Sequence, residues 1–260
     1  MIKIVTWNVN SLRVRLPQVL DWFSAHQPDI LALQETKLLD ENFPVTEINS
    51  AGYEVIYSGQ KTYNGVAILS RASTATSAVD VVKDIPGLDD SQRRVLFATY
   101  DTLRVMNVYV PNGESVESAK YRYKLTWLKK LSAYVKQQLT IYPHLVILGD
   151  FNIAPEPRDV HDPEAWQGQV LFSEPERAAL KTLLDAGLCD TFRLFDQDEK
   201  QYSWWDYRMM AFRRNRGLRI DHILASKALG ALCNSCKIDK EPRRWERPSD
   251  HAPVIAEFKL

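Results

Sequence analysis

Clusters of asparagine, aspartate, glutamate and histidine stand at five places beside strand-like apolar runs of this 260-residue chain. They contain Asn8 and Asn10, Glu35, Asp150 and Asn152, Asp221 and His222, and Asp250 and His251. Carboxylate and amide oxygens are the ligands that hard metal ions prefer, and an imidazole can hold or move a proton. If a fold gathers these groups at the ends of its strands, they suit metal-dependent phosphoryl transfer.

Two of these clusters directly follow apolar runs, and each has a competing local explanation. Glu35 comes after Ile30–Gln34, where a sheet edge would hold its carboxylate rigidly as a Mg²⁺ ligand, but an ordinary surface glutamate fits this stretch equally well. Asp150 and Asn152 are two residues apart, so their side chains point the same way if the strand over 145–148 continues. An acid beside an amide can then hold a water molecule and a phosphate oxygen together. The alternative is a turn, which Gly, Asp and Asn favour on backbone grounds.

Two of the five histidines have an aspartate as the preceding residue. Asp221 precedes His222, and Asp250 precedes His251 just before the last strand-like run. A histidine paired with an aspartate elsewhere in the chain has a fixed tautomer and a more basic ring. The other three histidines have no such context and are given no role.

The elements that must position these residues are short strands with helices between some of them. Strand-like runs cover residues 2–6, 30–34, 53–57, 65–69, 95–100, 103–109, 145–148, 219–225 and 252–258. Apolar side chains at helical spacing predict helices around 16–23 and 128–135, and Ser173 with Glu176 is a capping-box pattern that opens a helix through Leu184. This order predicts an α/β sandwich of two sheets with helices outside them.

Composition favours one domain over the whole chain, residues 1–260. A hydrophobic content of 45% can bury one large core, and no Pro/Gly/Ser-rich linker divides the sequence. No apolar run is long enough to span a membrane, and the chain begins with a strand pattern rather than a signal peptide. The three cysteines do not suggest a disulfide framework, so we expect a cytoplasmic protein.

Positive charge is concentrated locally, although the formal net charge is zero. Basic clusters lie within residues 208–219, 240–247 and 120–130. Arg208, Arg213 and Arg214 of the first cluster lie between Trp204 and Asp221, so the chain keeps them near the candidate site. Solvated surface explains any single cluster, but three clusters with aromatic residues beside them favour binding to a phosphate backbone.

Several longer stretches resemble the exonuclease III family of abasic-site (apurinic/apyrimidinic) endonucleases. The most specific are residues 28–37 (PDILALQETK), 215–226 (NRGLRIDHILAS), and 190–193 (DTFR) followed by 202–205 (YSWW). Residues 7–10 (WNVN), 109–112 (YVPN), 149–154 (GDFNIA) and 249–253 (SDHAP) extend the resemblance over nearly the whole chain. Leu194 departs from the pattern, since family members often have a basic residue after DTFR, but the candidate catalytic positions are intact.

The resemblance implies a four-layer α/β sandwich, with two mixed β-sheets flanked by helices, as in the endonuclease/exonuclease/phosphatase fold. It implies Mg²⁺-dependent hydrolysis of DNA phosphodiesters, with Mn²⁺ able to substitute. The expected reactions are cleavage of DNA 5′ to abasic sites, 3′–5′ exonuclease action and 3′-phosphatase action. The expected partner is double-stranded DNA, abasic or blocked at its 3′ end, and the expected state of the protein is a monomer.

The resemblance also implies roles for individual residues. The implied metal positions are Asn8, Glu35, Asp150, Asn152, Asp250 and His251, with Glu35 as the principal ligand. The implied catalytic residues are Tyr109, Asp150, Asn152, Asp221 and His251. Asp150 would orient or deprotonate the attacking water, and Asn152 and His251 would hold the phosphate. Candidate DNA contacts, which include arginines of the first basic cluster, are Asn112, Trp204, Arg208, Arg213, Arg214 and Leu218. Trp204 and Leu218 would line the pocket for a sugar that lacks its base.

Two other functions fit parts of the pattern. A phosphoesterase of the same fold that acts on inositol phosphates or sphingolipid would share the central catalytic positions, but it would not predict the stretches at 190–205 and 215–226. A non-catalytic nucleic-acid-binding regulator would require losses among the catalytic positions, and none is seen. Three points stay open at this stage: the balance of the three activities, the number of metals, and whether Asp150 or the His251–Asp221 pair is the general base.

Overall fold

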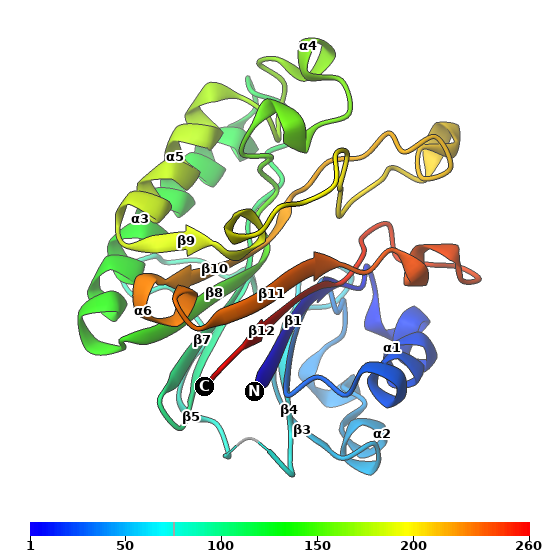
Figure 1. Ribbon diagram of the computed structural model, residues 1–260, viewed down its shortest axis with the longest axis vertical. Coiled ribbons are helices and arrows are strands. Elements are labelled where there is room, and N and C mark those ends of the chain that lie inside the picture. Colours follow the sequence, from blue (N-terminus) through cyan, green and yellow to red (C-terminus); the bar gives the residue numbers. More distant parts are fainter. Residues whose placement is uncertain (75) are drawn as a thin grey trace.

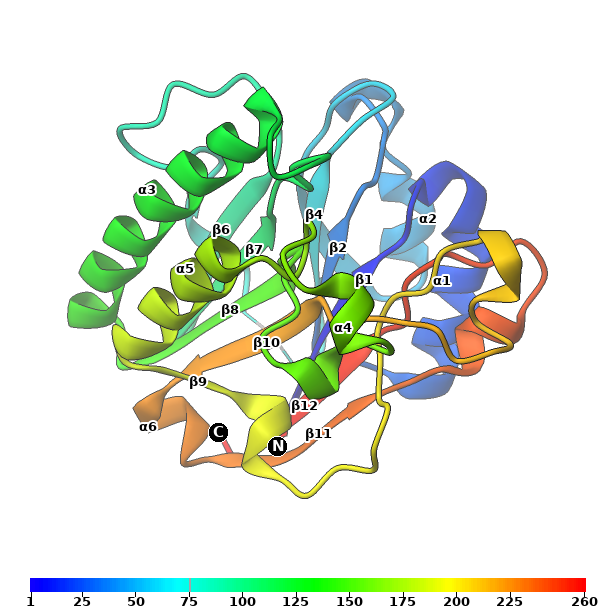
Figure 2. The same ribbon diagram turned by 90° about the horizontal axis from the view of Figure 1, so that it is seen from above.

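The structure, a computed structural model that describes residues 1–74 and 76–260, consists of two β-sheets packed face to face with helices on both outer sides (Figures 1 and 2). Each sheet has six strands and contains both parallel and antiparallel pairs. From one outer surface to the other, the layers are helices, sheet, sheet and helices. The predicted four-layer α/β sandwich is confirmed.

The first sheet contains the N-terminal and C-terminal strands. Its spatial order is β11 (Cys233–Ile238), β12 (Val254–Phe258), β1 (Ile2–Asn8), β2 (Ile30–Gln34), β4 (Val66–Arg71) and β3 (Tyr53–Ser58). β1 and β2 are parallel, with Asn8 opposite Gln34, and β12 is antiparallel to β1. The carboxyl ends of β1 and β2 therefore lie at the same sheet edge as the start of β12.

The second sheet repeats this arrangement. Its order is β5 (Val79–Val82), β6 (Val95–Tyr100), β7 (Leu103–Tyr109), β8 (His144–Asp150), β10 (Asp221–Ser226) and β9 (Leu188–Asp190). β7 and β8 are parallel and β10 is antiparallel to β8, so Tyr109 and Asp221 both lie opposite Asp150. Gly149 permits this close pairing, because a Cβ there would lie 1.8 Å from the carbonyl oxygen of Val108.

Two helices cover each outer face. α1 (Leu12–His26) and α2 (Val45–Ser50) lie on the first sheet, and α3 (Ala119–Ile141) and α5 (Glu174–Asp185) on the second (Figure 2). Shorter elements are α4 (Pro163–Trp166), α6 (Lys227–Gly230), η1 (Asp40–Asn42), η2 (Pro157–Asp159), η3 (Thr191–Leu194), η4 (Arg208–Met210) and η5 (Glu241–Arg244). The capping box of Ser173 and Glu176 at the start of α5 is confirmed. Across residues 1–74 and 76–260, no helix has the length and apolar character needed to cross a membrane.

Apolar side chains fill the spaces between all four layers. Ile4 and Val105 belong to a cluster between the sheets, Trp22 of α1 packs on the first sheet, and Trp127 of α3 packs on the second. All five residues of β2 and all six of β6 are buried. Burial on both faces explains why these strands are apolar at consecutive positions.

Candidate active site

Polar side chains from six strand ends meet at one edge of the sandwich. They are Asn8 at the end of β1, Glu35 after β2, Tyr109 and Asp150 at the ends of β7 and β8, Asp221 at the start of β10, and His251 before β12. A hydrogen bond between Asn8 and Asp150 joins the edges of the two sheets. The fold therefore gathers clusters that are far apart in the sequence.

Glu35, Asp150 and His251 form the centre of this site. One candidate ligand atom from each lies within 4.8 Å of the others. His251 Nε2 is 3.8 Å from Asp150 Oδ2. Two carboxylates at this spacing are donors that fit a divalent cation such as Mg²⁺ or Mn²⁺, and an imidazole lies beside them.

Asn8 bridges the two carboxylates. Its Nδ2 donates hydrogen bonds of 2.9 Å to Glu35 Oε1 and to Asp150 Oδ2. Its Oδ1 accepts a 3.0 Å hydrogen bond from the backbone N–H of Asn10, which fixes the orientation of the amide. The structure therefore places an N–H of Asn8, rather than an oxygen, beside the central carboxylates.

Glu35 stands in an uncommon backbone conformation, with a φ of 52°. Non-glycine residues in this left-handed region carry strain and cluster at functional sites. Oε2 of Glu35 lies 2.8 Å from Lys37 Nζ, and the Glu35 side chain is 17% exposed. Its carboxylate is therefore open to solvent on one side, while Asn8 holds the other side.

His251 lies between two carboxylates. Its Nδ1 is 2.9 Å from Asp221 Oδ2, and its Nε2 faces Asp150. Ser203 Oγ donates a 2.6 Å hydrogen bond to Asp221 Oδ2 and accepts one from the backbone N–H of Asp221. This chain of hydrogen bonds fixes the imidazole with Nε2 directed to the centre of the site.

Burial and neighbouring charges shift the pKa values of the central groups. Burial raises the pKa of the Asp150 carboxyl; His251 opposes this, and Asp221 and Glu35 raise it further. Burial alone would lower the pKa of His251, but Asp221 and Asp150 outweigh it and raise that pKa. A buried carboxylate that is costly to ionise gains strongly from a nearby cation. The site therefore favours a cation beside Asp150 and Glu35, and a protonated His251.

The strand ends at Asp150, so of the two alternatives for Asp150 and Asn152 the structure has the turn, and the two side chains do not share one strand face. Asn152 has a φ of 50°, and its N–H donates to Asp150 Oδ1 at 2.9 Å. This is the turn that Gly, Asp and Asn favour. Asn112 Nδ2 donates to Asn152 Oδ1 at 3.0 Å, and Asn152 Nδ2 donates to the carbonyl oxygen of Val110. The turn, and not a strand, holds the backbone of Asn152 next to Asp150 and its side chain against Asn112.

Tyr109 contributes a hydroxyl at the end of β7. Burial raises the pKa of its phenol well above the usual value, and Glu35 and Asp150 raise it further. The guanidinium of Arg94 lies 4.8 Å from the ring centroid. Tyr109 therefore keeps its proton at neutral pH and can donate a hydrogen bond.

Asp250 lies outside the central group. Its Oδ1 accepts a 2.9 Å hydrogen bond from Asn10 Nδ2, and its Oδ2 accepts a 3.0 Å hydrogen bond from Trp204 Nε1. Both carboxylate oxygens are thus directed away from Glu35 and Asp150. Asp250 therefore holds Trp204 in place. The geometry does not put Asp250 at the central cation position.

Trp204 and Leu218 lie side by side, but Leu218 does not line an open pocket. Each donates a backbone hydrogen bond to the other, at 2.9 and 3.0 Å. Leu218 is 0% exposed and belongs to an apolar cluster that includes Leu171 and Phe172. Leu171 has a left-handed φ of 75°, which the sequence does not predict. Protein side chains therefore fill the space around Leu218 that the sequence assigned to a sugar.

Residues 208–216 of the first basic cluster lie on a loop that projects beyond the sheets (Figure 1, yellow to orange), whereas Arg219 is buried and pairs with Asp159 and Asp190. Arg208 forms an ion pair with Asp206, with Nη2 2.6 Å from Oδ2. Arg213 and Arg214 are exposed. The positive charge of Arg208 is partly neutralised, so Arg213 and Arg214 are the stronger candidates for binding phosphate.

Four further side chains touch these residues but were not predicted as site residues: Asn10, Lys37, Ser203 and Lys124. The first three lie inside or beside stretches that carry the family resemblance, so that pattern could have identified them. Lys124 had no such signal, because a lysine on an amphipathic helix resembles an ordinary surface charge.

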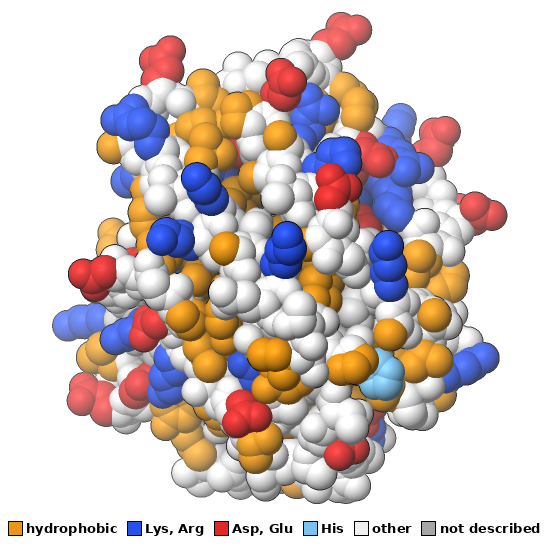
Figure 3. Space-filling model, turned by 90° about the vertical axis from the view of Figure 1, so that its left-hand side faces the viewer, with side chains coloured by type: hydrophobic (Ala, Val, Ile, Leu, Met, Phe, Trp, Pro, Cys, Tyr) orange, Lys and Arg blue, Asp and Glu red, His pale blue; other side chains and the backbone are white. Residues whose placement is uncertain are grey.

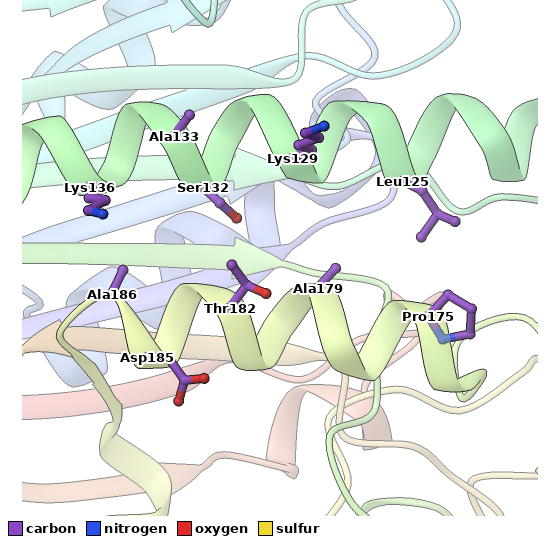
Figure 4. A pocket seen from close by; sticks show the side chains of 10 residues that line it. All are labelled: Leu125, Lys129, Ser132, Ala133, Lys136, Pro175, Ala179, Thr182, Asp185 and Ala186. Carbon is purple, nitrogen blue, oxygen red and sulfur yellow. The ribbon is translucent and has the colours of Figure 1, made fainter.

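An apolar groove lies on another part of the molecule, between α3 and α5. It has a volume of about 680 Å³, and its lining includes Leu125, Ala133 and Ala179, with Lys129 and Lys136 beside them (Figure 4). Basic and acidic side chains are interspersed on the face shown in Figure 3, which views the molecule from the side of these helices. The groove contains none of the strand-end residues, so the carboxylate group is the better candidate for the active site.

His222 is buried and uncharged, unlike His251. Its Nδ1 lies 3.1 Å from Arg219 Nη1 and its Nε2 lies 2.8 Å from the carbonyl oxygen of Ile153, so Nδ1 accepts and Nε2 donates. Burial and the charge of Arg219 lower the pKa of His222 to about 4. In an unfolded chain the pKa is about 6.5, so the unfolded state binds more protons between these two pH values.

We therefore expect the free energy of unfolding to fall as the pH drops from about 6.5 to 4, with a contribution on the order of 2–3 kcal/mol from His222. Above pH 6.5 this contribution is fully present. The His222→Asn variant should show a shallower fall over the same window. Urea unfolding of both proteins at several pH values measures the difference, and parallel pH profiles would show that His222 does not contribute.

Comparison with known proteins agrees with this geometry. Residues 5–251 match the Endonuclease/Exonuclease/phosphatase family. The chain therefore belongs to this family.

Relatives of known structure or activity narrow the assignment within the family. Exodeoxyribonuclease III of Haemophilus influenzae is 36% identical over 269 residues, which covers 99% of this chain and 100% of that protein. The structure of a Neisseria 3′ phosphatase, NExo, bound to product DNA hairpin is 48% identical, with a TM-score of 0.97 and full coverage of both chains. An AP endonuclease from Archaeoglobus fulgidus is 39% identical, with a TM-score of 0.95 and full coverage. The resemblance to the exonuclease III family of AP endonucleases is thus confirmed, and the protein is a hydrolase of the nuclease class.

Proposed function

We propose that the protein is a Mg²⁺-dependent DNA-repair phosphodiesterase that cleaves duplex DNA 5′ to abasic sites and acts at 3′ ends as a 3′–5′ exonuclease and 3′-phosphatase. The observation that carries this proposal is the group of Glu35, Asp150 and His251, whose ligand atoms lie within 4.8 Å of one another. The relatives described as a 3′ phosphatase and an AP endonuclease support the choice of DNA as substrate.

Each central side chain would have its own role in phosphoester hydrolysis. Glu35 and Asp150 would hold the cation, which when bound supplies a Lewis acid for the phosphoryl and leaving oxygens. Asp150 would orient the attacking water and accept its proton. The carboxylates of Asp221 and Asp150 favour the protonated form of His251, which would donate from Nε2 to a phosphate oxygen. This assignment favours Asp150 over the His251–Asp221 pair as the general base.

Neutral donors surround this centre. Tyr109 lies opposite Asp150, and Asn112 is hydrogen-bonded to Asn152 in the turn after it; the hydroxyl and the amides would stabilise negative charge on the phosphate or the leaving oxygen. They are fixed before substrate arrives, so little reorganisation is needed during the reaction. The exposed Arg213 and Arg214 would bind the duplex at a distance from the chemistry.

One observation favours the reactions at 3′ ends over cleavage at internal abasic sites. Leu218, which the resemblance places at the pocket for the sugar, is 0% exposed within a packed apolar cluster. A terminal phosphate or nucleotide can reach the carboxylates without displacing this cluster. We therefore infer that 3′-phosphatase and exonuclease rates exceed the rate of abasic-site cleavage.

The test is a rate comparison on three matched duplexes with Mg²⁺: one with an internal abasic site, one with a recessed 3′ hydroxyl end and one with a 3′-phosphate. We expect release of inorganic phosphate from the third duplex to be the fastest reaction. Fastest cleavage at the abasic site would refute the ranking but keep the phosphodiesterase. No cleavage of any duplex would refute the proposed function.

DNA binding provides a separate prediction. Arg213→Ala with Arg214→Ala should weaken duplex binding irrespective of sequence and flatten its salt dependence, by about one unit of slope for each phosphate group that the variant no longer binds. The chemical step at saturating enzyme should change little, because both side chains are exposed on the projecting loop. Fluorescence anisotropy over a range of salt concentrations measures both the affinity and the slope.

The matched control for this loop variant is Lys129→Ala with Lys136→Ala. These two lysines line the groove between α3 and α5. Removing them changes the net charge by the same amount without touching the projecting loop. Equal salt slopes in the wild type and the arginine variant would exclude Arg213 and Arg214 from the DNA-binding surface.

We further propose that residues 1–260 form a single catalytic domain that acts as a monomer. Residues from both ends of the chain support this proposal, because Asn8 and His251 belong to the same site. A cytoplasmic location and the use of Mg²⁺ rather than another divalent cation also remain predictions.

A further inference from the structure

Lys124 has no exposed surface, although it lies on the outer helix α3. A buried ammonium group is costly unless it is paired and fully hydrogen-bonded. Its Nζ donates to the carbonyl oxygen of Asn152 at 2.7 Å, to the carbonyl oxygen of Asn112 at 3.0 Å, and to Glu176 Oε1. These hydrogen bonds use all three donors of the group. The two carbonyls belong to residues whose side-chain amides are hydrogen-bonded to each other, and the backbone N–H of Asn152 donates to Asp150.

Glu176 is equally buried and connects Lys124 to the start of α5. Its carboxylate accepts 3.1 Å hydrogen bonds from the backbone N–H groups of Leu171 and Ser173, and another from the Ser173 hydroxyl. The Glu176 carboxylate therefore closes the capping box of α5 and also contacts Lys124, a contact that is not part of an ordinary capping box. Through Lys124 it reaches the two loops that carry Asn112 and Asn152.

We propose that Lys124 is a positioning residue, which fixes the backbone carbonyls of Asn112 and Asn152 so that the turn after Asp150 and the hydrogen bond between the two amide side chains are kept. This inference rests on the proposed function, which gives these amides their task. Asn152 has a left-handed φ of 50°, so its peptide groups need strong partners to hold this conformation. Without the ammonium group, the two buried carbonyls lose their donor and the peptides rotate toward other partners. The hydrogen bond from Asn112 Nδ2 to Asn152 Oδ1 then loosens.

A second buried cation contacts α3 at the far end of the sheet. Replacing it separates a general contribution to stability from the positioning role of Lys124. Arg104 is 2% exposed and donates to Gln138 of α3 and to Thr99. It is the second residue of β7, whereas Tyr109 is the last. At about 3.3 Å per residue, Arg104 lies roughly 16 Å from the active-site end of the strand. Arg104→Met is therefore a matched control for loss of a buried charge under α3.

The experiment compares wild type, Lys124→Met, Lys124→Met with Glu176→Gln, and Arg104→Met. Each is measured for urea stability and for kcat and KM on the 3′-phosphate duplex at saturating Mg²⁺. We expect Lys124→Met to lose stability and to lower kcat by about 10–100-fold, with a much smaller change in KM. The double variant should regain stability, because Glu176 no longer leaves an unpaired buried carboxylate, yet keep the low kcat, because both carbonyls still lack their donor. Arg104→Met should lose stability and keep the wild-type kcat.

The possible results distinguish a positioning role of Lys124 from a general effect on stability. A wild-type kcat in the double variant would overturn the positioning role, even if Lys124→Met alone fails to fold. An equal fall of kcat in Arg104→Met would overturn it too, since the loss would then follow stability alone. A wild-type protein without activity on any of the three duplexes would refute the proposed function and, with it, this role. If only the 3′-phosphate duplex is inert, kcat is compared on the duplex that the wild type cleaves. If the wild type is active and both Lys124 variants keep its kcat, only the role of Lys124 is refuted.

Discussion

Replacing Glu35 with alanine is expected to abolish turnover near neutral pH at low Mg²⁺, while binding to duplex DNA is largely kept. Glu35 supplies one of the two central carboxylates, and its side chain is the one that solvent reaches. The substitution removes a charged ligand of the cation but none of the exposed arginines on the projecting loop. Turnover measured against Mg²⁺ concentration, together with anisotropy of duplex binding, gives both results.

Glu54→Ala is the control for the Glu35 variant. Glu54 is an exposed glutamate on β3, an edge strand of the same sheet, and it should behave as wild type. Isothermal titration with Mn²⁺ would show directly whether Glu35→Ala weakens cation binding. Full turnover of Glu35→Ala at low Mg²⁺ would contradict the assignment of Glu35 as principal ligand.

Asp150→Asn and His251→Asn should each lower the rate of the chemical step by about 10²–10⁴-fold. General acid–base catalysis and electrostatic stabilisation of the transition state each contribute on this scale. Asparagine at position 150 cannot accept the proton of the attacking water, and asparagine at position 251 carries no positive charge. Single-turnover rates at saturating enzyme measure this step apart from DNA binding.

Asp221→Asn should act through His251. Asp221 lies 2.9 Å from the ring and fixes its orientation, so removing both groups should cost little more than removing His251 alone. The double variant Asp221→Asn with His251→Asn should therefore be about as slow as His251→Asn. Strictly additive losses would show that the two residues do not act as a unit.

The buried strands could be predicted well from sequence, whereas three of the four edge strands could not. β2, β6 and β7 match the expected ranges to the residue, because burial on both faces makes most of their residues apolar. β5, β9 and β11 were not predicted: β5 is largely exposed, β9 has three residues, and β11 contains Asn234, Ser235 and Lys237. The run predicted over 219–225 starts as a strand only at Asp221, because Arg219 turns away to pair with Asp159.

Site residues at the ends of strands could be predicted from the sequence, because the strand ends converge at one edge irrespective of the loop conformations. Asn8, Glu35 and Asp150 are of this kind. The positions of Asp250 and Lys124 depend on which loop or helix packs beside them, and sequence spacing does not encode that packing. For the same reason, the sequence suggested a pocket at Leu218 where the structure has a filled cluster.

The most direct test of the central claim is the dependence of phosphate release on the cation and on Asp150. Wild type and Asp150→Asn are each mixed in excess with a duplex that carries a 3′-phosphate, and inorganic phosphate is followed in chelator and then over a Mg²⁺ titration. We predict no release in chelator, a saturable rise with Mg²⁺ for wild type, and a rate at least about 100-fold lower for Asp150→Asn at every concentration. Release by wild type in chelator, or equal rates for the two proteins, would contradict the account.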